Sequence, residues 1–326
     1  MSRAPLRVLY LARYAPPNPP PPAKEAGVAP QYHREIYEIL ARLPLALETA
    51  TEPSRLFDAT FATDYVFGLY NKAPYRNSEI FVSAVCEYRR FPYLGAPPHV
   101  RAVAEDKHLA KIVAAHLGIE TSPWRVYRPG VSDRAAPPFA GPYIVKPRFG
   151  SASEHIDGRS VASSWHECLP LLGNCFDLGL DALVERFIDG ENVTVPVIAT
   201  PEPRPLPPVS AISEETGNII TYRQKRLLDG GLRRELVACP DVARIAQTTA
   251  TRLHQHLMPL DYSRADFRWD ARERKLVFLE VNVCCNLGSH SSFVLAAGAA
   301  GYTQTELVEL LLRSSLLRQQ VQWEHF

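Results

Sequence analysis

The segment SRADFRWDARERKLVFLEVNV, residues 263–283, predicts two antiparallel strands joined by the charged turn DARER. Side chains two residues apart on a strand point to the same face, so Arg264 and Asp266 project together. The same rule places Glu280 beside Asn282. Pairing of the two strands therefore gathers two carboxylates, one amide and one guanidinium on a single surface.

This surface has two interpretations. Carboxylate and amide oxygens are the ligands that Mg²⁺ uses when it carries substrate phosphates, and the arginine would then stabilise developing negative charge. The alternative is a solvated hairpin face of mixed charge. Apolar neighbours of the motif count against the solvated face, although the segment alone leaves both interpretations open: Phe267, Val277, Leu279 and Val281.

A second candidate site is PYIVKPRFGSASEHI (142–156), where a buried strand delivers Lys146 to a loop of small residues. Gly150, Ser151 and Ser153 allow backbone N–H groups to approach phosphate oxygens, and the lysine supplies positive charge. The loop is not a Walker A sequence, so a flexible hairpin tip is the competing interpretation.

Acidic residues surround the next turn, LVERFIDGENVTV (183–195). An extended segment ends at Glu185, turns at Asp189-Gly190 and presents Glu191 before the following strand. These carboxylates could bind an adenine amino group or ribose hydroxyls. Taken alone, they fit charge on an edge strand equally well.

The order of elements predicts a chain that combines α/β and α+β organisation. Strands and helices alternate at the N-terminus, which is typical of a doubly wound α/β domain, and later residues are rich in strands. The expected N-terminal elements are strands at 6–12, 65–71 and 91–95, and helices at 32–43 and from Ser78 onward.

Two further helices are expected. One covers EDKHLAKIVAAHLG (105–118), and its apolar residues share one face: Leu109, Ile112, Val113 and Leu117. The other is the C-terminal helix, which begins with a capping box formed by Thr303 and Glu306.

Composition excludes several classes of partner. The chain has 326 residues and a net charge of +1, so no global field favours nucleic acid or an anionic membrane. The N-terminal apolar stretch is interrupted by Arg7 and Arg13 and is too short for a signal peptide or membrane span. Six scattered cysteines without C-x-x-C pairs predict a cytoplasmic protein. A homodimer stays open.

Taken in order, these segments resemble the ATP-grasp superfamily, and within it the D-alanine–D-alanine ligase group. The resemblance covers about residues 91–315, and the ordered set is more specific than any single motif. Its motifs are PYLG (92–95), EDKHLAK (105–111), IVKPRFGSAS (144–153), LVERFIDGENVTV (183–195), RADF (264–267), FLEVN (278–282) and GSHSSF (288–293).

The resemblance implies an ATP-grasp fold with ATP and two Mg²⁺ ions as cofactors. It implies three parts: an N-terminal pre-ATP-grasp α/β domain (1–97), a central subdomain with the phosphate loop (98–182), and a C-terminal subdomain with the metal and oxyanion site (183–326).

The resemblance also assigns the nucleotide contacts. Lys107 and Lys146 match two lysines that grip the ATP phosphates. The loop that closes over the phosphates is matched by Gly150, Ser151 and Ser153. The adenine hinge is matched by Glu185 with the backbones of Arg186 and Ile188. Glu191 matches the ribose carboxylate, and Lys225 matches a lysine that reaches the terminal phosphate.

At the reacting end, Asp266, Glu280 and Asn282 match the ligands of the two Mg²⁺ ions. Arg264 matches the group that stabilises the tetrahedral oxyanion, together with a backbone N–H near Asn286. Ser291 or Ser292 lies where the family holds the carboxylate of the second substrate. The expected catalytic set is Arg264, Lys225 and Ser151, and the expected substrate contacts are Arg226, Asn286, Ser291 and Ser292.

The sequence departs from the family where the first substrate is held. The glycine pair, serine and glutamate that orient the first D-alanine are replaced by a proline-rich run, with Glu35 only a distant candidate. Arg226 stands in place of a tyrosine, Cys285-Asn286 in place of Pro-Gly, and Glu154-His155 where a second glycine is expected. We therefore expect substrates other than two D-alanines, and Arg226 suits a more acidic partner.

The resemblance implies small-molecule carboxylate and amine substrates, which are joined as an amide through an acyl phosphate. The alternatives are a true D-alanine–D-alanine ligase, a phosphotransferase that stops after phosphorylation, and a non-catalytic ATP-binding module. Retention of the metal ligands and Arg264 argues against the last. His33, His155 and His290 lack metal-ligand spacing and are expected to be packing or hydrogen-bonding residues.

Overall fold

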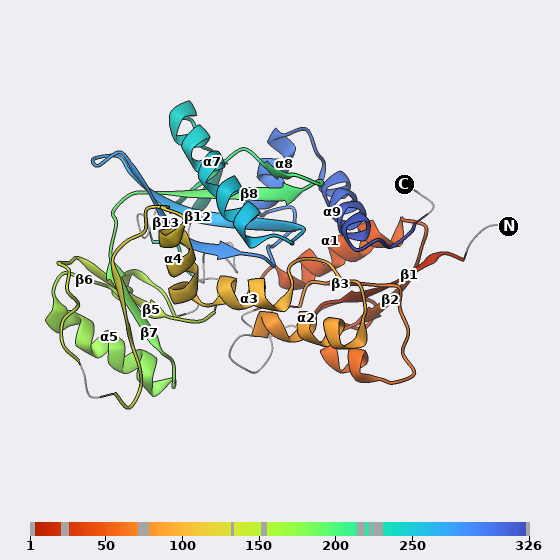
Figure 1. Cartoon of the computed structure of the whole chain (residues 1–326), viewed down its shortest axis with the longest axis horizontal. Helices are drawn as coiled ribbons and strands as arrows, with labels where there is room; N and C mark the ends of the chain where they lie inside the picture. Colours follow the sequence, from red (N-terminus) through yellow and green to blue (C-terminus); the bar gives the residue numbers. More distant parts are fainter. Residues whose placement is uncertain are drawn as a thin grey trace.

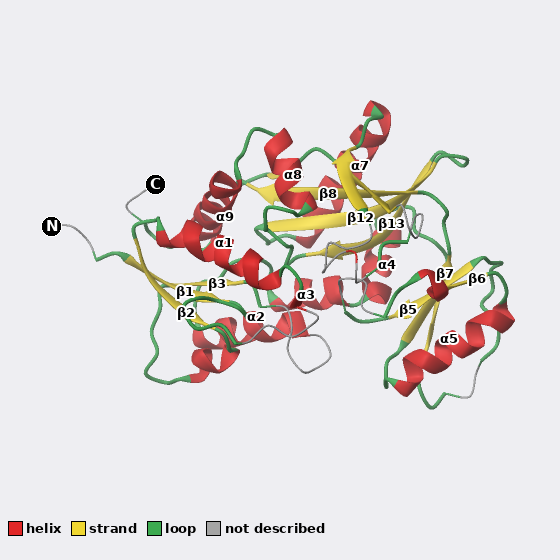
Figure 2. Cartoon of the chain, turned by 180° about the vertical axis from the view of Figure 1, so that it is seen from behind, coloured by secondary structure: helices red, strands yellow, loops and turns green. Residues whose placement is uncertain are grey.

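Three sheets follow one another along the long axis of the molecule (Figures 1 and 2). The computed structural model describes residues 4–20, 26–70, 78–131, 134–150, 155–213, 219–221, 224 and 231–323. The N-terminal sheet lies at one end, a four-stranded sheet at the other, and the largest sheet between them. Within these residues, none of the helices combines the length and hydropathy that crossing a membrane requires.

The N-terminal unit is a parallel three-stranded sheet in the order β2–β1–β3. Alternate residues of the central strand face opposite sides: Val8 and Tyr10 pack with α1, whereas Leu9 and Leu11 pack on the side of α2. The elements are β1 (Leu6–Leu11), α1 (Ala29–Ala41), β2 (Leu45–Ala50), the 3₁₀ helix η2 (Pro53–Phe57), β3 (Tyr65–Gly68) and α2 (Ser78–Arg89). The expectation of a doubly wound N-terminal sheet is confirmed.

Two details of this unit differ from expectation. The segment at 91–95 is not a strand: it makes a single parallel bridge between Val66 and Tyr93. Strand β2 was not predicted. Alternate residues are exposed, Ala46 and Glu48, because it is an edge strand.

Helices α3 (Pro98–Glu105) and α4 (Lys107–His116) lead from this unit toward the other sheets. Asp106 separates them and caps α4 by accepting hydrogen bonds from the backbone N–H groups of His108 and Leu109. The apolar face predicted for α4 is partly wrong. Leu109 and Ile112 are exposed, and the buried residues are Lys107, Ala110, Lys111 and Ala114. The helix turns two lysines inward, which hydropathy alone does not predict.

The four-stranded sheet is antiparallel, in the order β4–β7–β5–β6, and helix α5 covers one face. Its elements are β4 (Trp124–Tyr127), β5 (Tyr143–Pro147), the 3₁₀ helix η3 (Gly158–Ser160), β6 (Val161–Ala162), α5 (Trp165–Asp177) and β7 (Ala182–Arg186). In both views this lobe stands apart from the N-terminal unit (Figures 1 and 2).

The largest sheet has the order β11–β10–β8–β12–β13, with β9 added to β8. The predicted hairpin is confirmed: β12 pairs with β13, Arg264 lies opposite Asn282, and Asp266 lies opposite Glu280. The elements are β8 (Glu191–Ala199), β9 (Pro203–Pro205), β10 (Val209–Ser213), β11 (Leu232–Leu236), α7 (Pro240–Leu257), β12 (Tyr262–Asp270) and β13 (Lys275–Asn282).

The chain passes from the four-stranded sheet to the largest sheet between β7 and β8, that is, between residues 186 and 191. The expected boundary between 182 and 183 falls inside β7. The three domain ranges, 1–97, 98–182 and 183–326, stay predictions.

Two C-terminal helices, α8 (Ser292–Ala299) and α9 (Gln304–Arg318), close the fold against the N-terminal unit. The predicted capping box at the start of α9 is confirmed: Thr303 Oγ1 accepts from the backbone of Glu306, and the Glu306 carboxylate accepts from the backbone of Thr303. In both views the two chain ends lie at the same end of the molecule (Figures 1 and 2).

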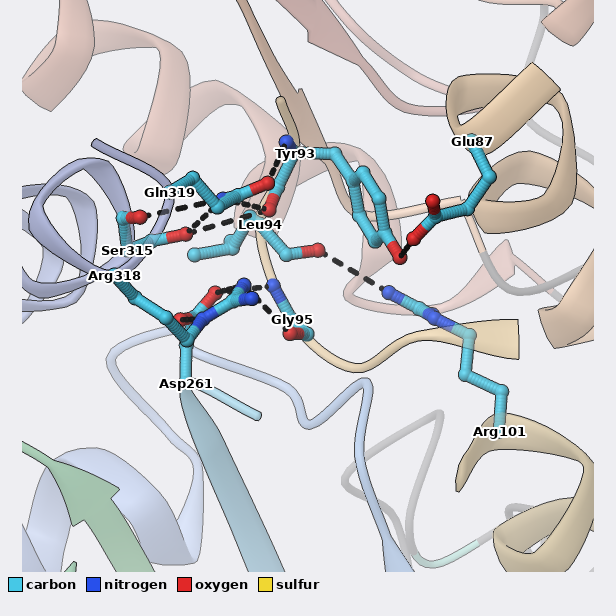
Figure 3. Close-up of polar contacts among 9 residues, drawn as sticks. All are labelled: Glu87, Tyr93, Leu94, Gly95, Arg101, Asp261, Ser315, Arg318 and Gln319. Atoms are coloured by element: carbon cyan, nitrogen blue, oxygen red, sulfur yellow. Dashed lines mark hydrogen bonds and ion pairs between the residues drawn. The ribbon is translucent and has the colours of Figure 1, made fainter. Parts of the chain in front are cut away.

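The buried carboxylate of Asp261 links three of these segments through hydrogen bonds (Figure 3). Asp261, which is 1% exposed, accepts a hydrogen bond from the Gly95 backbone N–H at 2.6 Å. It also accepts two from the Arg318 guanidinium, at 2.7 Å from Nε and 3.1 Å from Nη2. Arg318 donates in turn to the Gly95 carbonyl. The junction holds α9 and the segment after α2 against the start of β12.

Replacement of Arg318 tests this junction. Arg318→Ala should lower the free energy of unfolding by about 3 kcal/mol, because it leaves the buried Asp261 carboxylate with one donor and no counter-charge. Urea unfolding at neutral pH gives the value. Arg244→Ala, which removes an exposed pair with Asp241, is the matched control and should change it by less than about 0.5 kcal/mol. Equal effects of the two substitutions would contradict the structural role of the junction.

Candidate active site

A cavity of about 270 Å³ lies where the three sheets meet. Its walls come from β5 and β7, from one face of the largest sheet, and from α1 with Leu69 of the N-terminal unit. Most of the predicted site residues line it: Lys107, Lys146, Gly150, Glu185, Arg186, Ile188, Arg264, Asp266, Glu280, Asn282, Asn286, Ser291 and Ser292.

The other predicted residues are not placed in this cavity. Glu191 is exposed at the start of β8 and is not among the described lining residues, so its ribose role stays a prediction. Four predicted residues lie outside the described part of the chain: Ser151, Ser153, Lys225 and Arg226.

The cavity face of the largest sheet is polar because alternate residues of its strands point there. On β8, Asn192 and Thr194 line the cavity, whereas Val193 and Val195 pack on the opposite side with α7. The same alternation brings the motif residues of β12 and β13 to the cavity. A β-bulge between Asp266 and Phe267 shifts the register directly beside the motif.

Arg264 and Asp266 form a two-pronged ion pair in this face. Arg264 Nε donates to Asp266 Oδ1 at 2.9 Å, and Nη2 donates to Oδ2 at 2.7 Å. Burial alone would lower the pKa of Arg264, but the charge and hydrogen bonds of Asp266 outweigh burial and raise it. Thr194 and Asn282 also donate to Asp266, at 2.9 and 3.1 Å. The arginine is therefore held charged and in a fixed orientation.

The donor set of the hairpin fits Mg²⁺. Asp266, Glu280 and Asn282 offer two carboxylates and an amide oxygen, all hard oxygen donors. In the described part of the chain, no group of three or more His, Cys, Asp or Glu side chains could enclose a metal. An incomplete protein shell of this kind suits an ion that takes its remaining ligands from phosphates and water.

The opposite wall is built around a buried carboxylate, Glu185 on β7. Lys146 on β5 donates to Oε1 at 2.5 Å, and Lys111 Nζ on α4 lies 2.8 Å from Oε2. The three side chains are 3%, 7% and 0% exposed for Glu185, Lys146 and Lys111. Lys111 directs its hydrogen bonds to Thr121 Oγ1 and the Ser122 carbonyl, so it acts on Glu185 mainly through its charge.

The pKa values of this cluster follow from its charges. Burial alone would raise the pKa of Glu185, but Lys111 and Lys146 lower it to about 2. Burial lowers the pKa of Lys111, and Glu185 opposes that change. Glu185 is consequently ionised throughout the physiological range, with two ammonium groups beside it.

Lys111 was not predicted as part of the site. Its signal is nevertheless present in EDKHLAK, because residues four apart on a helix share a face and Lys111 follows Lys107 by four. Lys107 Nζ donates to the Gly150 carbonyl at 2.6 Å, at the start of the expected phosphate loop. Arg148 pairs with Asp106 at 2.6 Å, and this bond ties the same loop to the start of α4.

A further part of the cavity, termed here the substrate end, is lined by Tyr32, Arg234, Asn286, His290 and Ser292. Three of these residues are close neighbours: Asn286 Nδ2 lies 3.5 Å from His290 Nε2, and a Cβ on Gly288 would meet Asn286, Tyr32 and His290 at about 3.0 Å. Arg234 is near enough to act on His290 through its charge. Tyr32, His33 and Arg234 were not assigned to the site from sequence. They come from α1 and β11, outside the motifs.

Two residues of this region serve the scaffold. The Ser291 hydroxyl accepts from the Val294 backbone and caps α8. Glu35, the distant candidate for holding an amine, accepts from both the backbone and the hydroxyl of Ser289 at 2.9 Å, and from Gln304. Glu35 is not among the described lining residues. It fixes the loop that carries His290.

Substitution of Glu185 tests the buried cluster. Glu185→Gln should lower the free energy of unfolding by about 3–5 kcal/mol, because two buried ammonium groups lose their counter-charge. Adding Lys111→Met removes one of them and should recover part of the loss. Chemical unfolding of both variants gives the values. Glu202 is exposed, so Glu202→Gln is the control and should leave the free energy of unfolding nearly unchanged.

The loss of unfolding free energy in Glu185→Gln depends on pH in a way that follows from the depressed pKa of Glu185. Its ionisation stabilises the fold above the unfolded carboxyl pKa of about 4.3. That contribution is lost only as the pH falls toward 2, the folded value. The difference between Lys111→Met and the double variant Lys111→Met/Glu185→Gln should therefore be constant from pH 8 to pH 5, because this comparison leaves out Lys111, whose pKa burial lowers. A steep change within that window would contradict the ion-pair assignment.

Comparison with known proteins gives consistent matches. The family model described as D-ala D-ala ligase C-terminus matches residues 113–313. An uncharacterised protein, y4sG, of Sinorhizobium fredii is 28% identical and covers 71% of this chain and 68% of its own. A D-alanine–D-alanine ligase of a Synechococcus species (strain JA-3-3Ab) is 30% identical over 73% of this chain and 72% of its own. The structure of D-alanine–D-alanine ligase from Bacillus anthracis complexed with ATP superposes with a TM-score of 0.75, at 17% identity, over 98% of this chain and 99% of that one.

Proposed function

We propose that this chain, which belongs to the family described as D-ala D-ala ligase C-terminus, uses ATP to join a carboxylate to an amine through an acyl phosphate. The observation that carries the proposal is the convergence, in one cavity, of a cationic nucleotide wall and a hairpin with oxygen donors and a fixed arginine. The fold is the ATP-grasp fold of the solved D-alanine–D-alanine ligases.

ATP is needed because a carboxylate is a poor electrophile and oxide does not leave. Transfer of the terminal phosphoryl group to one carboxylate oxygen creates a leaving group. Lys107 and Lys146 line the cavity on the side of Gly150, where they would bind phosphate oxygens. Because Glu185 has two cations beside it, Lys146 can bind an anion without leaving the carboxylate unpaired.

The metal chemistry would come from Mg²⁺, which neutralises phosphate charge during transfer. Asp266, Glu280 and Asn282 are the residues that would hold it. Asp266 is already engaged by Arg264, Thr194 and Asn282, so its orientation is set before any ligand arrives. Such preorganisation reduces the rearrangement that catalysis requires.

The second step is attack of the amine on the acyl phosphate. The tetrahedral oxyanion that forms needs donors aimed at it, and Arg264 is fixed by its ion pair on the cavity wall for this purpose. The backbone N–H of Asn286 is the second donor that we assign. Collapse of the intermediate expels phosphate and leaves the amide. Without an amine, the acyl phosphate would be lost to water.

We propose substrates other than a pair of D-alanines. A family member that binds an amino acid needs an acceptor for its ammonium group, and Glu35, a distant candidate from sequence, is instead bound to Ser289 and Gln304. The relatives named D-alanine–D-alanine ligase favour that reaction as the second candidate.

The metal assignment is tested on β13. Glu280→Gln should reduce turnover more than ~100-fold while the protein stays folded, because charge stabilisation at a transferring phosphate supplies several kcal/mol. Release of ADP and phosphate across pairs of carboxylates and amines, with mass detection of the product, is the measurement. Glu273→Gln, in the exposed turn of the same hairpin, is the matched control and should keep full activity.

The same assay separates the competing reactions. A ligase forms the amide together with free phosphate, whereas hydrolysis of the acyl phosphate would release phosphate without an amide. A phosphotransferase would give a stable phosphorylated product and no free phosphate. Efficient formation of D-alanyl-D-alanine would establish the second candidate in place of the substrates proposed here. Full activity of Glu280→Gln would remove the metal site.

A further inference from the structure

Arg234 is a cation of the substrate end that no step above uses. It lies on β11, the edge strand of the largest sheet, opposite Ala211 of β10. Ala211, Leu232 and Arg234 all line the cavity, so this part of the edge strand faces inward. The side chain is half-buried. Within the described part of the chain, the side chain of Arg234 makes no hydrogen bond and no ion pair.

The surroundings of Arg234 are unfavourable to its charge. Burial lowers the pKa of Arg234, and the neighbouring charge of Arg264 lowers it further. The carboxylates that line the cavity belong to other parts of the site: Glu185 is held by two lysines, Asp266 is held by Arg264, and Glu280 lies opposite Asp266 on the hairpin. None of these three carboxylates raises the pKa of Arg234. A half-buried cation without a counter-charge is stabilised when a ligand supplies one.

His290 adds a hydrogen-bonding group beside this cation. Burial lowers its pKa, Arg234 lowers it further, and Glu35 opposes the change. The imidazole is therefore neutral near pH 7 and can donate or accept a hydrogen bond. It is held beside Asn286, in the loop that Glu35 fixes through Ser289. Ser292 contributes a hydroxyl to the same part of the wall.

We propose that one substrate of this ligase carries a second carboxylate, in addition to the groups that react, and that Arg234 binds it with help from His290. This inference rests on the function proposed above and names the class of substrate. The planar guanidinium matches a carboxylate with two parallel hydrogen bonds, and the adjacent imidazole satisfies a remaining oxygen.

The charge at this end favours a carboxylate over a phosphate. Arg234 brings one positive charge, His290 is neutral, and Arg264 is already neutralised by Asp266. A single net charge balances a carboxylate, whereas a dianionic phosphate group needs more. Binding of an ammonium group at this end is unfavourable, because the positive charge of Arg234 would repel it.

The test uses acids and their amides of the same shape. Glutamate against glutamine, and aspartate against asparagine, differ at the distal group alone. Each is offered to the full-length chain with ATP, Mg²⁺ and a panel of amines and carboxylates, and kcat/KM is measured from phosphate release. We expect the acid to exceed its amide by ~10–100-fold, the range for a hydrogen bond between charged groups. Arg234→Gln should abolish that preference, so that the acid and its amide are used with nearly equal kcat/KM.

Arg233→Gln is the matched control. Arg233 is the preceding residue of β11, it is 62% exposed, and it lies within 3.6 Å of Glu235 on the outer side. The substitution should leave the preference for the acid intact. Calorimetric binding of the same four compounds, in the presence of Mg²⁺ and ADP, gives a measurement that does not depend on turnover. Binding should lose its preference for the acid over the amide in Arg234→Gln and keep it in Arg233→Gln.

The outcomes are distinguishable. If no pair of substrates is turned over but the acids still bind through Arg234, the proposed function fails and this inference stands. If wild type binds acid and amide equally, or if Arg234→Gln keeps the preference, the inference is overturned. Weaker binding of ATP itself to Arg234→Gln would assign the arginine to the nucleotide. Tighter binding of O-phosphoserine than of glutamate would replace the carboxylate with a phosphate.

Discussion

The buried carboxylate of Glu185 is the interaction on which the geometry of the site depends. An ionised side chain that is 3% exposed needs counter-charges, and they come from two different elements, Lys146 on β5 and Lys111 on α4. This requirement fixes how α4 meets the four-stranded sheet. It also explains why α4 buries lysines and exposes Leu109. The pair of cations leaves a surplus positive charge beside the cavity, where an anionic substrate can use it.

The sequence predicts the hairpin of the largest sheet well because its information is local. Alternation along β12 and β13 states which side chains share a face, so the hairpin and its two polar pairs could be derived without a structure. The register beside the motif could not, because counting from the turn places Asp266 opposite Leu279, and the β-bulge after Asp266 places it opposite Glu280. The capping box of Thr303 and Glu306 is local in the same sense. The ATP-grasp resemblance adds the order of the elements, which periodicity cannot supply.

What the sequence could not predict depends on contacts between distant segments. Hydropathy places Leu109 inward, whereas the ion cluster places Lys111 there, and the partner of Lys111 lies on β7. Likewise, Tyr32 and Arg234 are 202 positions apart and carry no motif, yet both line the substrate end. The junction at Asp261 brings such segments together, because Gly95 and Arg318 reach it from opposite ends of the chain. Tertiary packing, which no window of residues contains, decides these positions.

The charges along the cavity also order the reaction. One wall carries surplus positive charge from Lys107 and the Glu185 cluster. The hairpin carries the carboxylates of Asp266 and Glu280, and the substrate end carries Arg234. Under the proposed function, a phosphate chain placed against the lysines would direct its terminal group toward Asp266 and Glu280, where a cation is attracted. Phosphate would then neutralise the lysines, so that they no longer attract the distal carboxylate of a substrate. If ATP binds first, Arg234 is the position that remains attractive to that carboxylate.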